Sequence, residues 1–287
     1  MDTRQATKNM EEIRQKYRMY TIFLVVLAVS FLLSGMAIVR FPNTFFVPFI
    51  LMVFCIPVAN KMNNLNKQFQ YVYKETFARN ILEEVFESVT CDWNMGFLEP
   101  AVEQFGLTQH GNRFSSEDYI KGSYQGVPFE QSDVVVKHVV RSGKQTHTYT
   151  YFKGRMFSFD LEKTLEGSVV IFSKNFMYPG NCNKMRHEKV DMESQKFNKT
   201  FKTKSIYPHD AFYVLTPQMM ECIERLERTY GNVAMRFVGR KLYVAINMSG
   251  DAFNGNINKP IVYVEEKNKI KQDTNVIVDI VKTLQMV

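Results

Sequence analysis

The sequence predicts an α+β fold in two parts, an N-terminal two-helix transmembrane hairpin followed by a cytosolic domain of antiparallel sheet with packed helices. Three observations lead to this prediction. Two uncharged apolar runs lie within the first 59 residues. Alternating apolar and polar residues, separated by glycine-containing turns, then dominate residues 119–172. Helical periodicity with capping signals returns at 216–231 and 274–284.

The first apolar run extends from Met19 to Val39 without a charge. As a helix it would be about 31 Å long, enough to cross a bilayer. The turn at 40–44 leads to a shorter run, from Phe45 to Ala59, whose two prolines are tolerable in a membrane helix. The length and the lack of charge disfavour two buried helices of a soluble protein and a cleaved signal peptide.

Basic residues flank the two runs unevenly, and this sets the expected orientation. The turn carries Arg40 alone, whereas both outer flanks are basic. By the positive-inside rule both termini are expected to be cytoplasmic. The flanking residues are Arg4, Lys8, Arg14, Lys16 and Arg18 before the first run, and Lys61, Lys67, Lys74 and Arg79 after the second.

The chain is expected to divide at the ends of these features. We predict a cytosolic N-terminal arm at 1–18, the transmembrane hairpin at 19–59, a juxtamembrane helix at 60–90, an α+β domain at 91–253 and a C-terminal strand and helix at 254–287. Within the juxtamembrane helix, apolar residues recur three and four apart, at Met62, Leu65, Phe69 and Val72. This seam could pair with the N-terminal arm or with a second copy of the chain.

Strands and turns follow in order along the predicted domain. Hairpins are expected around Gln125-Gly126, around 141–144 and around Gly239-Arg240, and Gly154 suits a β-bulge. Further strands are expected at 167–172 and 197–204. A short helix is expected at 100–105, and Thr216-Pro217 starts a helix that Gly231 ends. The segment 274–284 is expected to be a C-terminal amphipathic helix.

Six segments of the chain together carry a resemblance to a known family. They are Tyr119-Ile120 with Gly122, 126–130, Phe152-Lys153-Gly154, 197–201, 213–217 and 242–246. They resemble a bacterial family known as domain of unknown function 3137, over roughly Tyr73 to Phe253. The resemblance implies a bacterial inner-membrane protein with a cytosolic α+β domain, and it brings no catalytic residues.

Positive charge is concentrated in one part of the chain. The net charge is +7, and most of it lies between Lys174 and Lys204. On a domain tethered to the inner leaflet, this segment could contact anionic lipid headgroups. A solvated loop and strand face is the favoured explanation of the charge, because basic clusters are common on protein surfaces. No recognition motif supports nucleic-acid binding. The predicted headgroup contacts are Lys184, Arg186, Lys189, Lys196, Lys199, Lys202 and Lys204.

The sequence contains no motif for a familiar active site. A GxSxG elbow, GxGxxG and GxxxxGK[ST] are all absent. His138 and His147 fall on neighbouring predicted strands, but no carboxylate or cysteine at ligand spacing joins them. The four cysteines form no CxxC pair, which suits a reducing cytosol. We therefore expect no catalytic, cofactor-binding or metal-binding residues, no cofactor and no small-molecule ligand.

The function expected from these features is a membrane-anchored cytosolic interaction domain. It would cross the membrane twice, bind another protein and use lipid headgroups as an accessory surface. The alternative is an enzyme that acts on a membrane-proximal substrate through a site assembled from scattered residues. A deep polar pocket with convergent His, Asp or Cys side chains would favour the enzyme, and a flat exposed face would favour the interaction domain.

Overall fold

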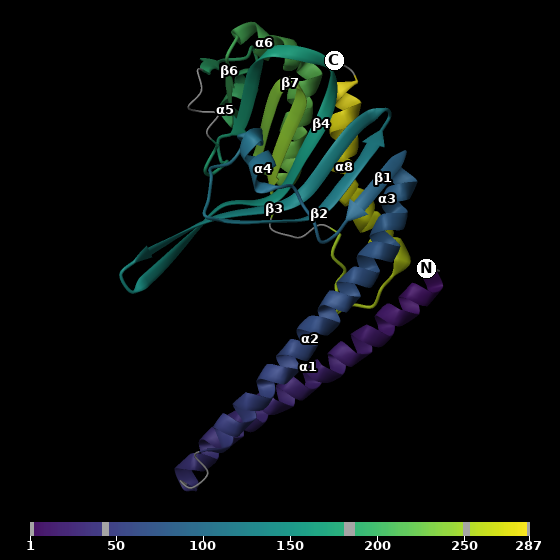
Figure 1. Ribbon diagram of the computed structural model, residues 1–287, viewed down its shortest axis with the longest axis vertical. Coiled ribbons are helices and arrows are strands. Elements are labelled where there is room, and N and C mark those ends of the chain that lie inside the picture. The colour runs from purple at the N-terminus through teal and green to yellow at the C-terminus, as the bar shows by residue number, and fades with distance from the viewer. Residues whose placement is uncertain (1–2, 42–45, 181–186, 249–252, 286–287) are drawn as a thin grey trace. The chain divides into compact units, whose positions relative to one another are not determined.

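The computed structural model describes residues 3–41, 46–180, 187–248 and 253–285 (Figure 1). The chain divides into two compact units. The first consists of residues up to 81 together with 253–270, and the second consists of 82–252 together with the C-terminal residues from 271. The expected α+β class, with an antiparallel sheet and packed helices, is confirmed.

The first unit is built on two long helices, α1 (Thr3–Arg40) and α2 (Val47–Tyr73), which pack against each other. Pro48 lies in the first turn of α2, where its missing N–H is not needed, and Pro57 lies inside the helix. A single π-helical turn, η2 (Lys74–Ala78), continues α2 directly into α3 (Arg79–Val85). The expected helix thus ends at Val85 and not near Val89, because residues from Ser88 onward form a strand.

Apolar residues are buried in the polar N-terminal part of α1 and in the polar C-terminal part of α2. Ala6, Met10 and Ile13 of α1 are buried, as are Leu65 and Phe69 of α2. Two residues of the predicted seam, Leu65 and Phe69, are thus buried within one chain, whereas Met62 and Val72 are half-buried. Farther along the same unit, the side-chain amide of Gln70 pairs with the backbone N–H and C=O of Gly255, at 2.9 and 2.8 Å.

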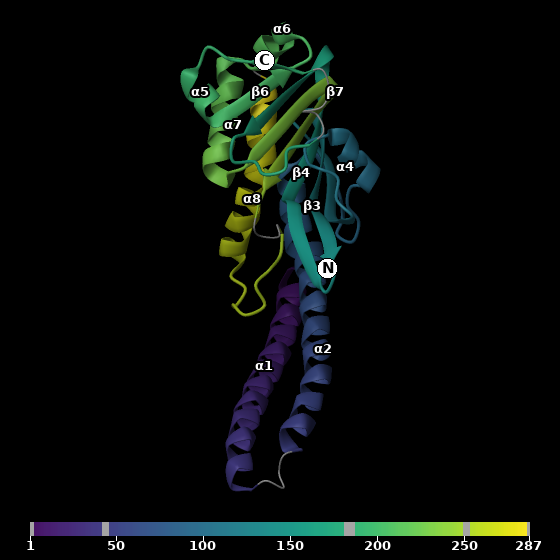
Figure 2. The same ribbon diagram turned by 90° about the vertical axis from the view of Figure 1, so that its left-hand side faces the viewer.

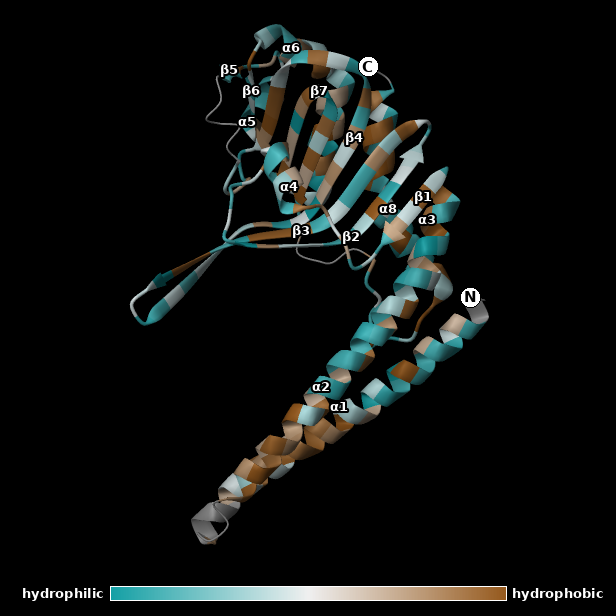
Figure 3. Cartoon of the chain, viewed as in Figure 1, coloured by the Kyte–Doolittle hydropathy of each residue, from teal (hydrophilic) through white to brown (hydrophobic). Residues whose placement is uncertain are grey.

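The apolar stretches of the two helices are exposed. Within the described residues, one helix is long and apolar enough to cross a membrane, over Gln5–Met36 of α1. The helix α2 is apolar only as far as Ala59 and then becomes polar, so the described part of the second predicted span falls short of that length. Figure 3 shows the apolar stretches of α1 and α2 as a brown band next to the grey residues of the turn.

The second unit is built on one antiparallel sheet in the order β1-β2-β3-β4-β6-β5, with β7 also pairing with β4. Its first strands are β1 (Ser88–Asp92), β2 (Arg113–Tyr124) and β3 (Val127–Ser142). The predicted turn at Gln125-Gly126 joins β2 to β3, and both residues have positive φ (+49° and +77°), as a type I′ turn requires. The predicted turn at 141–144 joins β3 to β4.

Strand β4 (Gln145–Ser173) runs without a break from the turn at 141–144 through Gly154 and the strand predicted at 167–172. Its neighbours are β6 (Phe201–Ser205), β5 (Glu188–Val190) and β7 (Val233–Asn247). Gly154 pairs regularly on both sides, and the bulge lies nearby, opposite Val136 and Lys137. The glycine is needed there because an added Cβ would lie 2.1 Å from the carbonyl oxygen of Ile246.

Two local predictions were wrong. Gly239 does not turn a hairpin: β7 continues through it and pairs with β4 from Asn247 to Ala234. With φ of +55°, Gly239 accommodates an irregularity opposite Leu165 and bends the strand without reversing it. The predicted strand at 197–204 begins with a helix, α5 (Gln195–Thr200), because Ser194 caps it by accepting a hydrogen bond from the Phe197 N–H.

Helices cover both faces of this sheet (Figure 2). The helix α4 (Glu99–Phe105) packs on one face, over a core that contains Val134, Phe152 and Phe172. On the other face lie α7 (Pro217–Tyr230) and the C-terminal part of α8 (Tyr263–Leu284), which starts earlier than predicted. The start and end of α7 are as predicted, and α6 (Pro208–Val214) precedes it.

Candidate functional site

The short helix α4 presents two carboxylates to solvent. It begins after Leu98 with Pro100 in its first turn, and it ends at Gly106, whose φ is +69°. Val102 and Phe105 are buried against the sheet. Glu99 and Glu103 are four residues apart, so they lie on one side of the helix, and both are exposed.

The segment after α4 is held in place by backbone contacts. The Gly180 N–H donates to Leu107 O at 3.0 Å, and the Gln109 N–H donates to Tyr178 O at 3.2 Å. Glycine is required where these backbones approach, because a Cβ at Gly180 would lie 2.0 Å from Gly106 O. These contacts restrict the backbone conformation of the segment that leads from α4 to His110.

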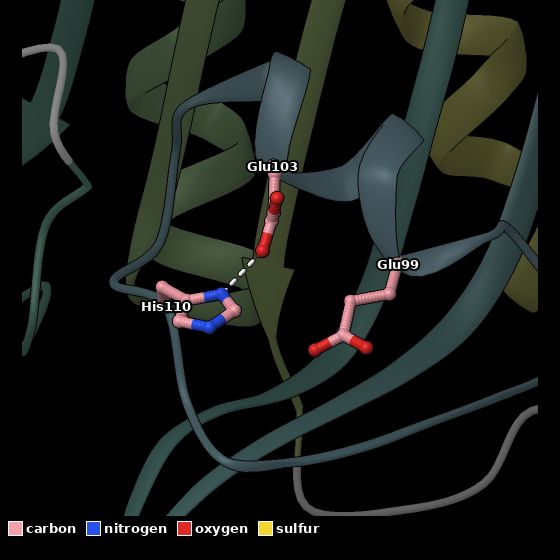
Figure 4. Close-up of side chains that lie close together, drawn as sticks. All are labelled: Glu99, Glu103 and His110. Carbon is pink, nitrogen blue, oxygen red and sulfur yellow. Dashed lines mark ion pairs between the residues drawn. The ribbon is translucent and has the colours of Figure 1, made fainter.

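His110 returns toward α4 and completes a cluster of three side chains. Its Nδ1 forms an ion pair with Glu103, and one ligand atom from each of Glu99, Glu103 and His110 lies within 4.8 Å of the others. Figure 4 shows His110 and Glu103 pointing toward one another, with Glu99 on the same side of α4. Because 61% of the His110 side chain and 47% of that of Glu103 are exposed, this ion pair alone stabilises the fold little.

The cluster lines an open cavity of about 540 Å³. Thr108, Phe114 and Val136 also contribute to its wall. The Thr108 hydroxyl oxygen is buried and has no hydrogen-bond partner among the described residues. This cluster is not among the predicted sites, because no cysteine or carboxylate lies at close ligand spacing to His110 in the sequence. The usable signal was the Glu-x-x-x-Glu pair of a predicted helix, followed by a histidine.

A second feature is the outer part of the β3–β4 hairpin, residues 138–149, which we call the β3–β4 extension. It projects beyond the rest of the sheet (Figure 1). Pairing of β2 with β3 ends at Arg113 and Lys137, and pairing of β7 with β4 ends at Asn247 and Gly154. Over the extension, β3 and β4 therefore pair only with each other among the described strands.

Side chains on one face of the extension combine imidazole and apolar groups. His138 lies opposite Tyr149, and Val140 lies opposite His147, so all four share a face. Val140 is 39% exposed and Tyr149 is 46% exposed. His138 and His147 belong to neighbouring cross-strand pairs on this face and are not directly opposite each other. His138 stacks on Tyr151, with ring centroids 5.5 Å apart.

The predicted headgroup residues lie partly on one face of β5 and β6. Lys184 and Arg186 are outside the described residues. Lys189 pairs directly with Lys204, and Lys202 is two residues from Lys204 along β6, so these three side chains point to the same face. The other two belong to α5: Lys196 forms an ion pair with Glu224, whereas Lys199 is exposed in the last turn. Lys189 is itself paired with Asp191.

The more deeply buried of the two described cysteines in the second unit is poorly suited to nucleophilic chemistry. Cys222 of α7 is buried, and its thiol lies 3.7 Å from Asp279 O. Burial raises the pKa of this thiol above its ordinary value of 9.0, so the reactive thiolate is scarce at neutral pH.

A family model matches the C-terminal part of the chain. Residues 150–286 match the family described as "Protein of unknown function (DUF3137)". The resemblance inferred from the sequence is thereby confirmed. The matched segment begins later than expected, within β4, and continues through α8. No curated protein matches the chain.

A solved structure with a similar arrangement is the crystal structure of the mycobacterial trehalose monomycolate transport factor A, TtfA. The identity is 7% and the TM-score is 0.36. The match covers 71% of this chain and 93% of that chain.

Proposed function

We propose that this DUF3137-related chain is a membrane-anchored interaction protein whose cytosolic domain binds a protein partner through the β3–β4 extension. The observation that carries the proposal is the extension itself. Two-stranded hairpins have marginal stability in water unless a third strand or a packed surface supports them. Residues 141–150 are all exposed, and neither outer edge is paired by a described strand.

The composition of the extension favours a partner that adds a strand. Val139, Val140, Thr146, Thr148 and Thr150 are β-branched and favour extended backbone. An unpaired strand edge offers N–H and C=O groups that a second chain can satisfy by β-augmentation. The exposed Val140 and Tyr149 side chains would then supply contacts that select the partner.

Exposed apolar residues on α1 and α2 support membrane anchoring. Leu32, Leu33 and Met36 of α1 are 60–72% exposed, and Phe49 and Val53 of α2 are similarly exposed. An apolar surface of this size is not compatible with water but is matched by hydrocarbon. With the asymmetry of basic residues, this supports two spans in a bacterial inner membrane with both termini cytoplasmic.

The topology is tested by labelling intact cells with a membrane-impermeant maleimide. Single cysteines are introduced by Phe41→Cys, next to the turn, and by Lys144→Cys, at the tip of the extension. We expect labelling of the first from outside and of the second only after cell lysis. Labelling at Lys144→Cys in intact cells would place the domain outside and contradict the proposal.

The interaction is tested by site-specific photocrosslinking of the full-length chain in membranes. A photoreactive amino acid at Val140 or Tyr149 should give an adduct of one discrete mass. The matched control is Phe212, which is 50% exposed on α6 and should give none. An adduct with twice the mass of the chain would identify a second copy as the occupant, and absence of any adduct at both positions would refute the proposal.

A second candidate function is contact with anionic lipid headgroups. The register of β5 and β6 favours it, because Lys202 and Lys204 point to one face and no described residue pairs with either in a salt bridge. Each basic residue that reaches an anionic surface contributes about 1 kcal/mol to membrane binding.

A further inference from the structure

We infer that Glu99, Glu103 and His110 bind a divalent transition-metal ion at the mouth of the cavity beside α4. The inference is independent of the proposed interaction through the β3–β4 extension. It assigns a role to three exposed side chains that the fold itself does not need. Val102 and Phe105 anchor α4 from its opposite side.

The donor set fits an ion such as Zn²⁺ or Mn²⁺. Two carboxylates and one imidazole offer two oxygens and one nitrogen, whereas Mg²⁺ and Ca²⁺ favour oxygen alone. In a tetrahedral zinc site with bonds of about 2.0–2.1 Å, neighbouring ligand atoms are roughly 3.3 Å apart. The ligand atoms here already lie within 4.8 Å of one another, so small side-chain rotations would complete the site.

The local charges also favour a cation. Glu99 and Glu103 are held close on one side of α4, and in the described residues the sole ion-pair partner of either is His110. The two carboxylates give the cluster two negative charges beside a single imidazole. A divalent ion would neutralise them and would replace the Glu103–His110 contact by two metal bonds.

Backbone contacts hold the ligand residues in place without a bound ion. The Leu107–Gly180 hydrogen bond and the close approach of Gly180 to Gly106 hold the path between α4 and His110. Gly111, next to His110, approaches Lys137 O so closely that a Cβ would lie 2.3 Å from it. A ligand set on backbone fixed in this way loses little entropy when it binds.

The cavity provides room for a water ligand in an open coordination position. Three protein ligands plus water is the arrangement of zinc sites that remain accessible to other molecules. The Thr108 side chain contributes to the cavity wall, and its hydroxyl has no hydrogen-bond partner among the described residues. The oxygen itself is buried, so a hydrogen bond to such a water would need a rotation of the Thr108 side chain.

The test measures Zn²⁺ binding to the purified full-length chain in detergent, without a histidine tag and after removal of metal. Isothermal titration calorimetry should give one site. Glu99→Gln, Glu103→Gln and His110→Asn should each weaken Zn²⁺ binding at least about tenfold. The matched control is His209→Asn, because the exposed His209 pairs with the buried Asp210, 3.3 Å away, and no third ligand joins them among the described residues. That variant should bind Zn²⁺ like the unchanged protein.

Two further measurements separate this site from adventitious binding. The near-ultraviolet spectrum of the Co²⁺-loaded protein should lack a thiolate charge-transfer band, because no cysteine belongs to the site. Melting curves in chelator should be the same for His110→Asn and the unchanged chain, which shows that the variant folds. Zn²⁺ binding that is undiminished in both Glu103→Gln and His110→Asn would overturn the inference. So would Mg²⁺ binding with equal affinity that survives His110→Asn.

Discussion

Arg155 of β4 donates two hydrogen bonds to Asp273 of α8, one to the backbone carbonyl at 2.7 Å and one to the carboxylate at 3.2 Å. Only 3% of the arginine side chain is exposed. The contact joins residues 118 positions apart and fixes the C-terminal part of α8 to the sheet face formed by β4 and β7. A buried guanidinium needs such a partner, because desolvation of an unpaired charge is costly.

Removal of the Asp273 carboxylate should therefore destabilise the second unit. We expect Asp273→Ala to lower the free energy of unfolding by about 3 kcal/mol, since it leaves the Arg155 charge buried without its counterion. Fluorescence of Trp93, the sole tryptophan, reports urea unfolding of this unit in the detergent-solubilised chain. The control is Asp191→Ala, which breaks an exposed pair with Lys189 and should cost less than about 1 kcal/mol. Equal losses in the two variants would contradict this account.

Sequence reasoning succeeded where the determining contacts are local. Thr216 caps α7 through the Met219 N–H only three residues away, and the Gln125-Gly126 turn needs only its own backbone conformation. These signals lie within a few residues of one another in the sequence. The family resemblance rests on the same kind of local segment.

Sequence reasoning failed where distant contacts decide the outcome. Gly239 carries a local turn signal, but pairing with β4 on both sides of it keeps β7 extended. The cluster at His110 depends on Gly106 approaching Gly180, a contact between segments more than seventy residues apart. Neither contact has a signature in one sequence. The same holds for the β3–β4 extension, which stands out because β2 begins only at Arg113 and β7 ends at Asn247.

Cys222 should resist alkylation in the folded protein. Burial raises the pKa of its thiol, so at about pH 8 less thiolate is present than at an ordinary cysteine. In single-cysteine variants that retain only Cys222 or only the half-buried Cys91, iodoacetamide should label Cys91 faster. In urea the two rates should converge. Faster labelling of folded Cys222 would show that α7 and α8 do not shield it.

The raised pKa of the Cys222 thiol also predicts how the free energy of unfolding changes with pH. A thiol whose pKa is raised by folding contributes its full stabilisation below the pKa of the unfolded chain, near 9.0, and loses it as the pH rises through the folded value. Unfolding free energies of the unchanged chain should thus fall above about pH 9 more steeply than those of Cys222→Ala. Parallel curves would exclude this contribution.

Asn112 should control the base of the β3–β4 extension. Its side-chain amide donates to Val139 O and accepts from the Val139 N–H, both at 2.8 Å, and so acts as one further residue of β2. We expect Asn112→Ala to speed hydrogen exchange at the Val139 amide, with no change in β1. Asn112→Asp keeps the acceptor and should preserve most of the protection. Unchanged exchange in Asn112→Ala would mean that the extension is held by β3–β4 pairing alone.

Headgroup contact should protect specific lysines from chemical modification. In nanodiscs of anionic phosphatidylglycerol, we expect slower acetylation of Lys199, Lys202 and Lys204 than in nanodiscs of zwitterionic phosphatidylcholine, because these side chains have no described salt-bridge partner and are available to phosphate. Lys144, at the tip of the β3–β4 extension, is the internal control and should react equally in both.

Acetylation at high salt distinguishes lysines that contact lipid headgroups from lysines that are covered by protein. Screening shortens the range of surface charge interactions to about 3 Å at 1 M salt, so protection in anionic nanodiscs should disappear there. Protection that is the same in both lipids, or that persists in high salt, would assign the lysines to a solvated or protein-covered surface. In that case the positive charge of β5, β6 and α5 would serve solubility and not membrane binding.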